Sequence, residues 1–583
     1  MENEQRKHIK QDRANRLFGN TPIKKAIWIV VIPSLLTALM VGLYSFADTI
    51  FIQQFVPKTK IIFDTNTNPG EIYNFLPSLN IRHITHDEYY TLYEKYKNIG
   101  AGIPEINGNL IVSTANAAFQ PLIVFSNSIV FLVPVGASIY YTKCIGKGYE
   151  FTGKNLWATM FWVCFSLSLL ATLISFTLVG SGLIDSLAGR NIVDPNVVKD
   201  ANERELLQAY YDAAHNMSVS WASQYVYIYA SGTIIQGLSL FLSYFIRAEG
   251  YNVYTMGVGI GSNIINISLD AVFIIVLKQG VLGGVVATII GWTFNLLMYV
   301  WYVIYLNIKG KSWLDFRKLF KFKFNKALLG PTFLLGASGF VRGFGTAIAF
   351  AVLNLLFTKT SFSLSGSYQF YLAKCMPVLF LFVMAIFGIN DGARSLLSFN
   401  YVKRDFKRCR EIYIWTLIVA VTYAVLSYIL VTATAESVIV KVLNTTDDTK
   451  YEVAKFMRVM MLRIVFLSFS ISSVLLFQGT NDIEKSLLSV SMENFICYLI
   501  IAPLSWLIGS LIFRYTGSYE WSNYAILIAF VVNSLISSMI LFGFSWHYTT
   551  KKLPNIDQTK LSWSRKIEHK FFVQAAEYEK QFA

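Results

Sequence analysis

Histidine and cysteine are both scarce in this chain of 583 residues. All histidines lie outside the long apolar stretches or at their ends: His8, His83, His86, His215, His547 and His569. This placement excludes a histidine metal centre or a histidine general base inside those stretches. The five cysteines fall in the apolar stretches or next to the basic ends that follow them, and their number is odd. We therefore predict no structural disulfide.

Charged residues are few as well, at 15% of the chain, whereas 54% of the residues are hydrophobic and apolar runs of 20 or more residues recur. An α-helix needs about 20 such residues to cross a bilayer. A transmembrane β-barrel would instead show segments of about ten residues with alternating polarity. The sequence therefore predicts an all-α membrane protein. Its first apolar segment is too long for a cleavable signal, and we expect the amino terminus to be retained.

Twelve transmembrane helices are predicted with a window of about 20 residues. They lie near residues 24–56, 112–142, 156–181, 218–246, 251–277, 281–307, 327–357, 365–391, 411–432, 453–478, 483–512 and 522–547. An even number places both termini on one side, and Lys and Arg are concentrated in the loops of that side. The positive-inside rule then predicts cytoplasmic termini, and we expect a multi-pass protein of the plasma membrane. We attribute the net charge of +15 to this bias and to anionic lipid rather than to nucleic acid.

The two halves of the chain repeat each other. Pro33 in "IPSLL" corresponds to Pro331 in "GPTFLL", and Gly136 in "VGASIYYTKCIGKG" corresponds to Gly392 in "DGARSLLSFNYVKRD". Six-helix halves that repeat in the same direction are typical of transporters that rock about a site between them. We expect two pseudo-symmetric six-helix lobes with the substrate site between them.

The predicted domain organisation follows from these spans. It comprises a cytosolic N-terminal segment (1–23), an N-lobe (24–307) with extracellular insertions at 57–110 and 182–217, a cytosolic linker (308–326), a C-lobe (327–547) and a cytosolic tail (548–583). In the first insertion, "HITHDEYY" places His83 and His86 beside two carboxylates, a pattern more typical of a solvated helix face than of a metal site. We expect this insertion to form a small extracellular cap. The basic, aromatic tail is predicted either to lie along the inner membrane surface or to form a free helix.

Four polar residues of the N-lobe are predicted at one depth. Asp48, Asp270 and Thr288 each lie seven or eight residues from the outer end of a span, about 10–12 Å deep at 1.5 Å per residue. Asn266 precedes Asp270 by one turn and shares its helix face. This all-oxygen cluster suits a hard monovalent cation, or a proton on a carboxylate desolvated beside a like charge, and it does not distinguish Na⁺ from H⁺. Pro33, upstream in the same span as Asp48, provides a helix kink.

The C-lobe has the opposite polarity. Arg342, Lys374 and Arg463 are predicted near mid-membrane, with Glu493 at a similar depth. Basic groups that outnumber their acidic partners in a membrane favour either an anionic ligand or an internal salt network. These four residues are candidates for a substrate cavity in the C-lobe, and both explanations remain open.

Several segments together resemble the multidrug and toxin extrusion (MATE) family, within the wider multidrug/oligosaccharidyl-lipid/polysaccharide flippase superfamily. They are "IPSLLTALMVGLYSFADTIFIQQ", "VGASIYYTKCIGKG", "FIRAEGYNVYTMGVGIGSNIINISLDAVFIIVLKQGVLGGVVAT" and "FGINDGARSLLSFNYVKRDFKRCRE". The resemblance implies a cation-coupled (H⁺ or Na⁺) secondary antiporter that exports amphiphilic small molecules by alternating access. It also implies that Asp48 takes a proton or helps to bind sodium together with Asn266, Asp270 and Thr288, and that Pro33 is the kinking proline.

Two other functions fit parts of the pattern. The basic C-lobe suits a flippase or exporter of an anionic lipid or organic anion. An integral-membrane lipid-modifying enzyme would use Asp48 and Asp270 as acid and base, but such an enzyme has no need of duplicated rocking halves. We expect a transporter rather than an enzyme, with no cofactor apart from Na⁺ or H⁺ as coupling ion. The expected partners are the membrane and an amphiphilic substrate, including lipid, with no nucleic acid, and the protein is expected to be a monomer.

Overall fold

Helices form all the regular structure that the computed structural model describes. The described residues are 15–55, 87–97, 103, 105–106, 108–277, 279–321, 326–363, 367–443, 445, 447–554 and 563–581. No strand occurs in these ranges. Most of the first predicted insertion, including His83 and His86, lies outside them. The all-α membrane fold predicted from the sequence is confirmed.

The helices follow the predicted spans closely. In the first half of the chain they are α2 (Ile23–Phe55), α3 (Asp87–Tyr96), α4 (Gly108–Lys147), α5 (Glu150–Gly180), α6 (Leu183–Ala188), α7 (Ala201–Ser231), α8 (Thr233–Ala248), α9 (Asn252–Asp270) and α10 (Gly280–Ile308). In the second half they are α11 (Lys326–Lys359), α12 (Ser367–Val402), α13 (Phe406–Thr434), α14 (Val440–Val442), α15 (Asp447–Met461), α16 (Arg463–Gly479), α17 (Ile483–Ser491), α18 (Cys497–Thr516) and α19 (Tyr519–His547). A tail helix, α20 (Trp563–Lys580), ends the chain.

Eleven helical segments of the described residues are long and apolar enough to cross a membrane, and a twelfth is obtained when α7 and α8 are counted as one span. These two helices meet at 48°. At Gly232, between them, a Cβ would overlap the Ile289 side chain of α10, so that glycine favours this close approach. The sequence predicted one continuous span at 218–246. The structure has a bent pair instead, and its first helix begins at Ala201, where Asp200 caps the first turn.

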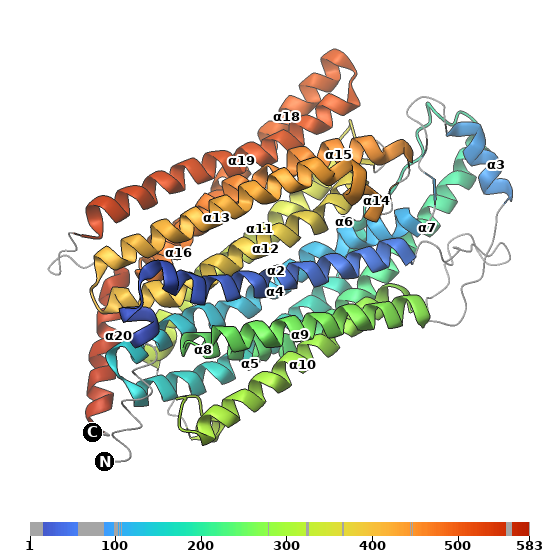
Figure 1. Cartoon of the computed structure of the whole chain (residues 1–583). Coiled ribbons are helices and arrows are strands. Elements are labelled where there is room, and N and C mark those ends of the chain that lie inside the picture. Colours follow the sequence, from blue (N-terminus) through green and yellow to red (C-terminus); the bar gives the residue numbers. More distant parts are fainter. Residues whose placement is uncertain are drawn as a thin grey trace.

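Both chain termini lie at the same end of the bundle, and α3 lies at the opposite end (Figure 1). Two long helix pairs join the halves: α2 runs beside α12, and α4 runs beside α11. The first two spans of each half therefore form the seam between the lobes. Any change in the angle between the lobes has to pass through these two contacts.

The sequence repeat appears at this seam as a pair of equivalent contacts. Gly136 of α4 lies against α11, where a Cβ would overlap the Thr332 carbonyl. Gly392 of α12 lies against α2, where a Cβ would overlap the Ser34 side chain. Thr332 and Ser34 each directly follow one of the two paired prolines. The glycine and proline motifs that repeat in the sequence therefore meet across the seam, as pseudo-symmetry requires.

Replacing Gly136 by alanine is expected to destabilise the protein, because the added methyl group would force α4 and α11 apart. Overpacking of this kind costs about 1–3 kcal/mol. Gly330→Ala, also in a seam helix, is the matched control, since a Cβ there meets no atom within 4 Å. The measurement is the melting temperature of the purified protein in detergent. Equal melting temperatures for the two variants would contradict close packing at the seam.

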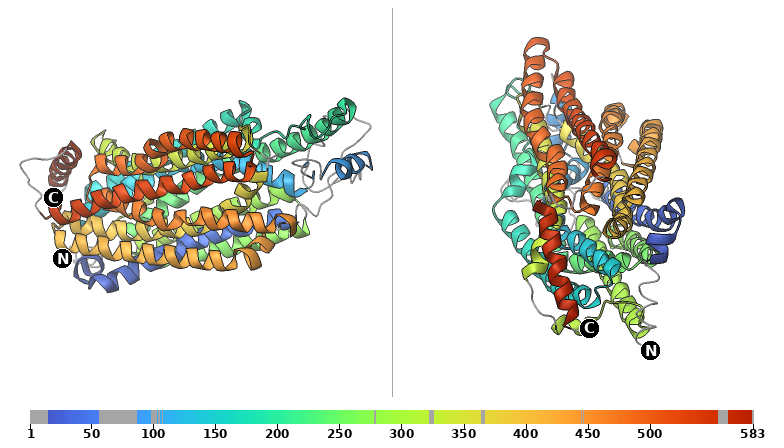
Figure 2. Two further views of the ribbon diagram at one scale, coloured as in Figure 1. Left: turned by 90° about the horizontal axis from the view of Figure 1, so that it is seen from above. Right: turned by 90° about the vertical axis from the view of Figure 1, so that its left-hand side faces the viewer.

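The tail helix α20 crosses the end of the bundle that holds both termini (Figure 2). Its Phe571 and Phe572 are buried and pack on Tyr140 of α4, with ring centroids 4.8 and 6.5 Å from that of Tyr140. Glu568 forms a 2.6 Å ion pair with Lys143 of α4, whose side chain is fully buried. The tail is therefore docked on the bundle, an arrangement that neither sequence-based alternative included.

The same helix also contacts the C-lobe. The backbone carbonyl of Ser564 accepts a hydrogen bond from Asn481, in the turn between α16 and α17, at 3.4 Å. Arg565 donates to the hydroxyl of Tyr548, after α19, at 3.0 Å. Because α20 bonds to α4 on one side and to the second half on the other, it bridges the two lobes at this end.

At the opposite end, parts of both predicted insertions are anchored. Glu203 of α7 accepts hydrogen bonds from Lys95, at 2.7 Å, and from Tyr96, both on α3. These two donors stabilise the carboxylate and lower the pKa of Glu203. The backbone carbonyl of Leu187, in α6, accepts a 2.8 Å hydrogen bond from Asn354 of α11. The second insertion therefore reaches across to the C-lobe.

Candidate functional site

A cavity of about 280 Å³ lies between α2, α4 and α7–α10 of the N-lobe, and Phe380 of α12 also lines it. Asp48, Asn266 and Thr288 line this cavity. Asp270, one turn after Asn266, is fully buried beside them, close enough to interact electrostatically with Asp48. The structure thus brings together the four N-lobe residues selected from the sequence.

Asn266 links α9 to α10 within this group. As placed, its amide nitrogen donates to the Thr288 hydroxyl at 3.3 Å. With the amide turned over, the nitrogen donates to Asp270 Oδ2 at 3.3 Å and the oxygen accepts from the Thr288 backbone amide at 3.0 Å. We prefer this second orientation because it satisfies both ends of the amide. Asn266 then holds one oxygen of Asp270 and leaves the other free.

The two carboxylates are the uncompensated charges of the site. Asp48 is 7% exposed and Asp270 is fully buried, and Oδ1 of each has no hydrogen-bond partner. Tyr225 of α7 hydrogen-bonds to Asp48. Arg247 lines the same cavity, but its Nε donates to Thr255 at 3.2 Å. Among the described residues no base forms an ion pair with either carboxylate, and buried ionised carboxylates require a counter-charge or a proton.

Local sequence explains why two acids fit in so small a space. Gly284 faces Asp48 with no side chain, and a Cβ there would overlap the carboxylate. The Gly284 carbonyl also accepts a 3.1 Å hydrogen bond from Thr288, one turn later. Directly after Asp270 the backbone changes to a π-helical segment, Ala271–Val276. Such segments are frequent at functional sites because they turn side chains out of regular register.

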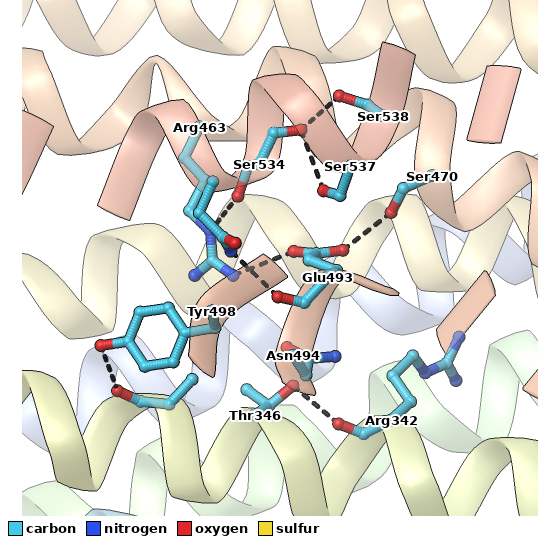
Figure 3. Close-up of polar contacts among 12 residues, drawn as sticks. Arg342, Thr346, Arg463, Ser470, Glu493, Asn494, Tyr498, Ser534, Ser537 and Ser538 are labelled. Carbon is cyan, nitrogen blue, oxygen red and sulfur yellow. Dashed lines mark hydrogen bonds and ion pairs between the residues drawn. The ribbon is translucent and has the colours of Figure 1, made fainter. Parts of the chain in front are cut away.

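A second cavity, of about 50 Å³, lies in the C-lobe between α11, α12, α16 and the junction of α17 with α18. Arg342, Arg463 and Glu493 line it (Figure 3). Arg463 forms a 3.0 Å ion pair with Glu493 and donates to Ser534 at 2.7 Å. Ser470 donates to the second carboxylate oxygen of Glu493 at 2.8 Å. The charge of Glu493 is therefore fully engaged within the protein.

Lys374, the fourth C-lobe candidate, does not line this cavity. Its ammonium group donates to the backbone carbonyl of Leu443, in the connection before α15, at 2.7 Å. The sequence placed Lys374 near mid-membrane because the predicted span ended at residue 391. The helix continues to Val402, so that Lys374 lies close to its first turns. The structure separates it from the other three residues.

Sequence reasoning missed several groups that shape the two sites. Tyr225 and Tyr229, four residues apart on one face of α7, both line the N-lobe cavity. Ser470 and Ser534 hold the C-lobe ion pair, and they lie in serine-rich stretches of otherwise apolar spans, "SFSISS" and "NSLISS". The signal for these residues in the sequence was the occurrence of polar side chains at helical spacing inside apolar spans. Composition alone does not tell which of them face a cavity.

Comparison with known proteins agrees with this architecture. The MatE family model matches residues 372–507. An uncharacterised protein of Mycoplasmoides gallisepticum, the MG447 homolog MYCGA2290, is 25% identical over 502 residues, which cover 84% of each chain. A solved outward-facing multidrug resistance MATE transporter of the MOP superfamily has a TM-score of 0.63 and 17% identity, covering 92% of this chain and 97% of its own. A MOP superfamily transporter from Pyrococcus furiosus, described as having a binding pocket of reverse polarity, has a TM-score of 0.65 and 17% identity, covering 93% and 98%.

The helices long and apolar enough to span a membrane, their arrangement in two repeated halves and the cavities within them have the architecture of a membrane transporter. The segment that matches the MatE family model lies in the C-lobe, and the chain as a whole has the fold of the solved MATE transporters. The family resemblance read from the sequence motifs is confirmed.

Proposed function

We propose that the protein is a cation-coupled antiporter. In this proposal Na⁺ or H⁺ occupies the group of Asp48, Asn266, Asp270 and Thr288 and drives export of an amphiphilic small molecule. The observation that carries the proposal is the pair of buried carboxylates, each with one unbonded oxygen and no basic partner among the described residues. A cation or a proton supplies the missing positive charge.

Helix α2 connects this site to the seam between the lobes. Asp48 lies in its outer part, whereas Ser34 contacts Gly392 of α12 four turns closer to the termini. Pro33, inside α2, interrupts the helix hydrogen-bonding and gives it a place to bend. When a cation neutralises the carboxylates, α2 is drawn towards α9 and α10, and its contact with α12 changes. A ligand shifts such an equilibrium by its difference in affinity for the two forms.

The N-lobe cavity fits a substrate with an apolar body. Its walls include the aromatic side chains of Phe119, Phe131, Tyr225, Tyr229 and Trp292 together with several side-chain amides. Its volume of about 280 Å³ is close to the lower limit of small-molecule sites. Because Asp48 belongs to the same wall, substrate and coupling cation compete through one site, and the entry of one favours release of the other.

Transport by protein reconstituted into liposomes tests this proposal. A fluorescent lipophilic cation is loaded, and either an inward Na⁺ gradient or an inward H⁺ gradient is imposed. We expect one of the two gradients to accelerate dye extrusion, and an ionophore for that ion to abolish the acceleration. Protein-free liposomes give the background leak. If neither gradient accelerates extrusion of cationic, neutral or anionic dyes, the antiport proposal is wrong.

A further inference from the structure

Arg342 is the charged group of the C-lobe cavity that takes no part in the Arg463–Glu493 ion pair. The guanidinium of Arg342 faces the cavity and lies over the ring of Phe387, 4.3 Å from its centroid. Among the described residues it makes no hydrogen bond or ion pair. In Figure 3 the dashed line at Arg342 ends on its backbone carbonyl, which accepts from Thr346 at 2.8 Å. Arg463 and Glu493, by contrast, are bonded to each other.

The acids near Arg342 are already engaged. Glu493 is bonded to Arg463 and to Ser470. Asp391, which lies outside the cavity lining and interacts electrostatically with Arg342, forms a 2.6 Å ion pair with Arg394 and accepts a hydrogen bond from Tyr244 at 2.5 Å. Each acid is matched by one base, so that the positive charge of Arg342 remains. Since a charged group within a membrane helix bundle is costly unless it is paired, the cavity favours an anion.

The size of the cavity limits what that anion can be. At about 50 Å³ it has room for only a few water molecules. A whole amphiphile does not fit, whereas a phosphate or a carboxylate group does. Guanidinium is the side chain best suited to such oxyanions, because it offers paired, coplanar N–H donors. Phe380 lines both this cavity and the larger one of the N-lobe, so that a group held at Arg342 lies one side chain away from the apolar cavity.

We propose that the C-lobe cavity is a binding site for a compact oxyanion, a phosphate or carboxylate group, held by Arg342. The Arg463–Glu493 pair forms one wall and does not compete for the ligand. Of the two explanations open at the level of sequence, the internal salt network accounts for Arg463 and Glu493, and the anionic ligand accounts for Arg342. The existence of this binding site does not depend on the proposed transport function. The further statement that the transported molecule carries an oxyanion group rests on that function.

Thermal stability of the delipidated protein in neutral detergent, titrated with inorganic phosphate at constant ionic strength, tests the site. We expect phosphate to raise the melting temperature by about 2 °C or more at saturation. The shift is lost in Arg342→Gln and partly retained in Arg342→Lys, which keeps the charge. Arg514→Gln, which removes an exposed arginine at the far end of α18, keeps the full shift. Without phosphate, Arg342→Gln melts at or above the wild-type temperature, because it removes an unpaired charge, and this shows that the variant is folded.

A second arm distinguishes a free anion from a lipid headgroup. Wild-type protein and Arg342→Gln are compared in nanodiscs of phosphatidylcholine with and without phosphatidic acid. Stabilisation by phosphatidic acid that depends on Arg342 identifies a lipid phosphate, and stabilisation by inorganic phosphate alone identifies a free oxyanion. A wild-type protein stabilised by neither, or a shift that persists unchanged in Arg342→Gln, overturns the proposal. If neither phosphate nor phosphatidic acid stabilises the protein but a gradient drives dye extrusion, the oxyanion proposal is wrong and the antiport proposal stands. If phosphate binds but no gradient drives transport, only the antiport proposal is contradicted.

Discussion

Replacing Asp48 by asparagine is expected to reduce gradient-driven transport strongly while raising the melting temperature of the protein. Asparagine keeps the shape of the side chain but carries no charge, so that the cation loses its main ligand or the proton its acceptor. Coupling free energies of about 1–3 kcal/mol correspond to roughly 5- to 150-fold, and we expect a loss of transport in this range. Stability rises because Asp270 no longer lies buried beside a second carboxylate.

Initial rates of dye extrusion test the expected loss of transport, and melting curves measured on the same preparations test the expected gain in stability. Asp48→Glu retains the carboxylate and is expected to keep partial activity. Glu205→Gln, which removes an exposed carboxylate from α7, is the control for a general loss of negative charge. Wild-type transport by Asp48→Asn under the same gradient would show that Asp48 has no coupling role, whatever the fold.

Glu568→Gln is expected to give the largest loss of stability. It leaves the Lys143 ammonium fully buried without the carboxylate that now lies 2.6 Å away. Breaking a buried ion pair from one side typically costs about 3–5 kcal/mol. The centroid of the Tyr140 ring lies 5.0 Å from the Lys143 nitrogen, and its cation–π interaction offsets only a small part of this free-energy cost. We expect α20 to leave the bundle, exposing Phe571 and Phe572.

Melting temperature and the rate of tryptic cleavage at Lys570 report this release. The double variant Lys143→Met/Glu568→Leu replaces both charges by apolar groups of similar size and is expected to recover most of the stability. A Glu568→Gln variant with wild-type melting and cleavage would show that the pair does not hold the tail in place. Because α20 bonds to both lobes, its release also removes a link between the lobes at this end of the bundle.

Depth within a span and helix periodicity were enough to select most of the candidate sites. Asp48, Asp270 and Thr288 were chosen because they lie at one distance from the outer ends of their spans, and the structure places them together. The same reasoning failed for Lys374, because the predicted span ended eleven residues before the helix does. A depth counted along one helix is reliable only when the ends of that helix are known. Long apolar segments fix the existence of a span better than its limits.

An all-helical membrane fold, duplicated halves and a resemblance to MATE transporters could all be inferred from the sequence alone. Long apolar runs have one solution in a bilayer, because backbone groups there must bond within the helix, and the repeated proline and glycine motifs mark equivalent positions. Which of the charges are paired is known only from the three-dimensional arrangement of the helices. The sequence does not distinguish Arg342 from Arg463 as a partner for Glu493, yet Glu493 bonds to Arg463 and leaves Arg342 unpaired. Partner choice depends on how helices distant in sequence are rotated and spaced, and no local pattern encodes that geometry.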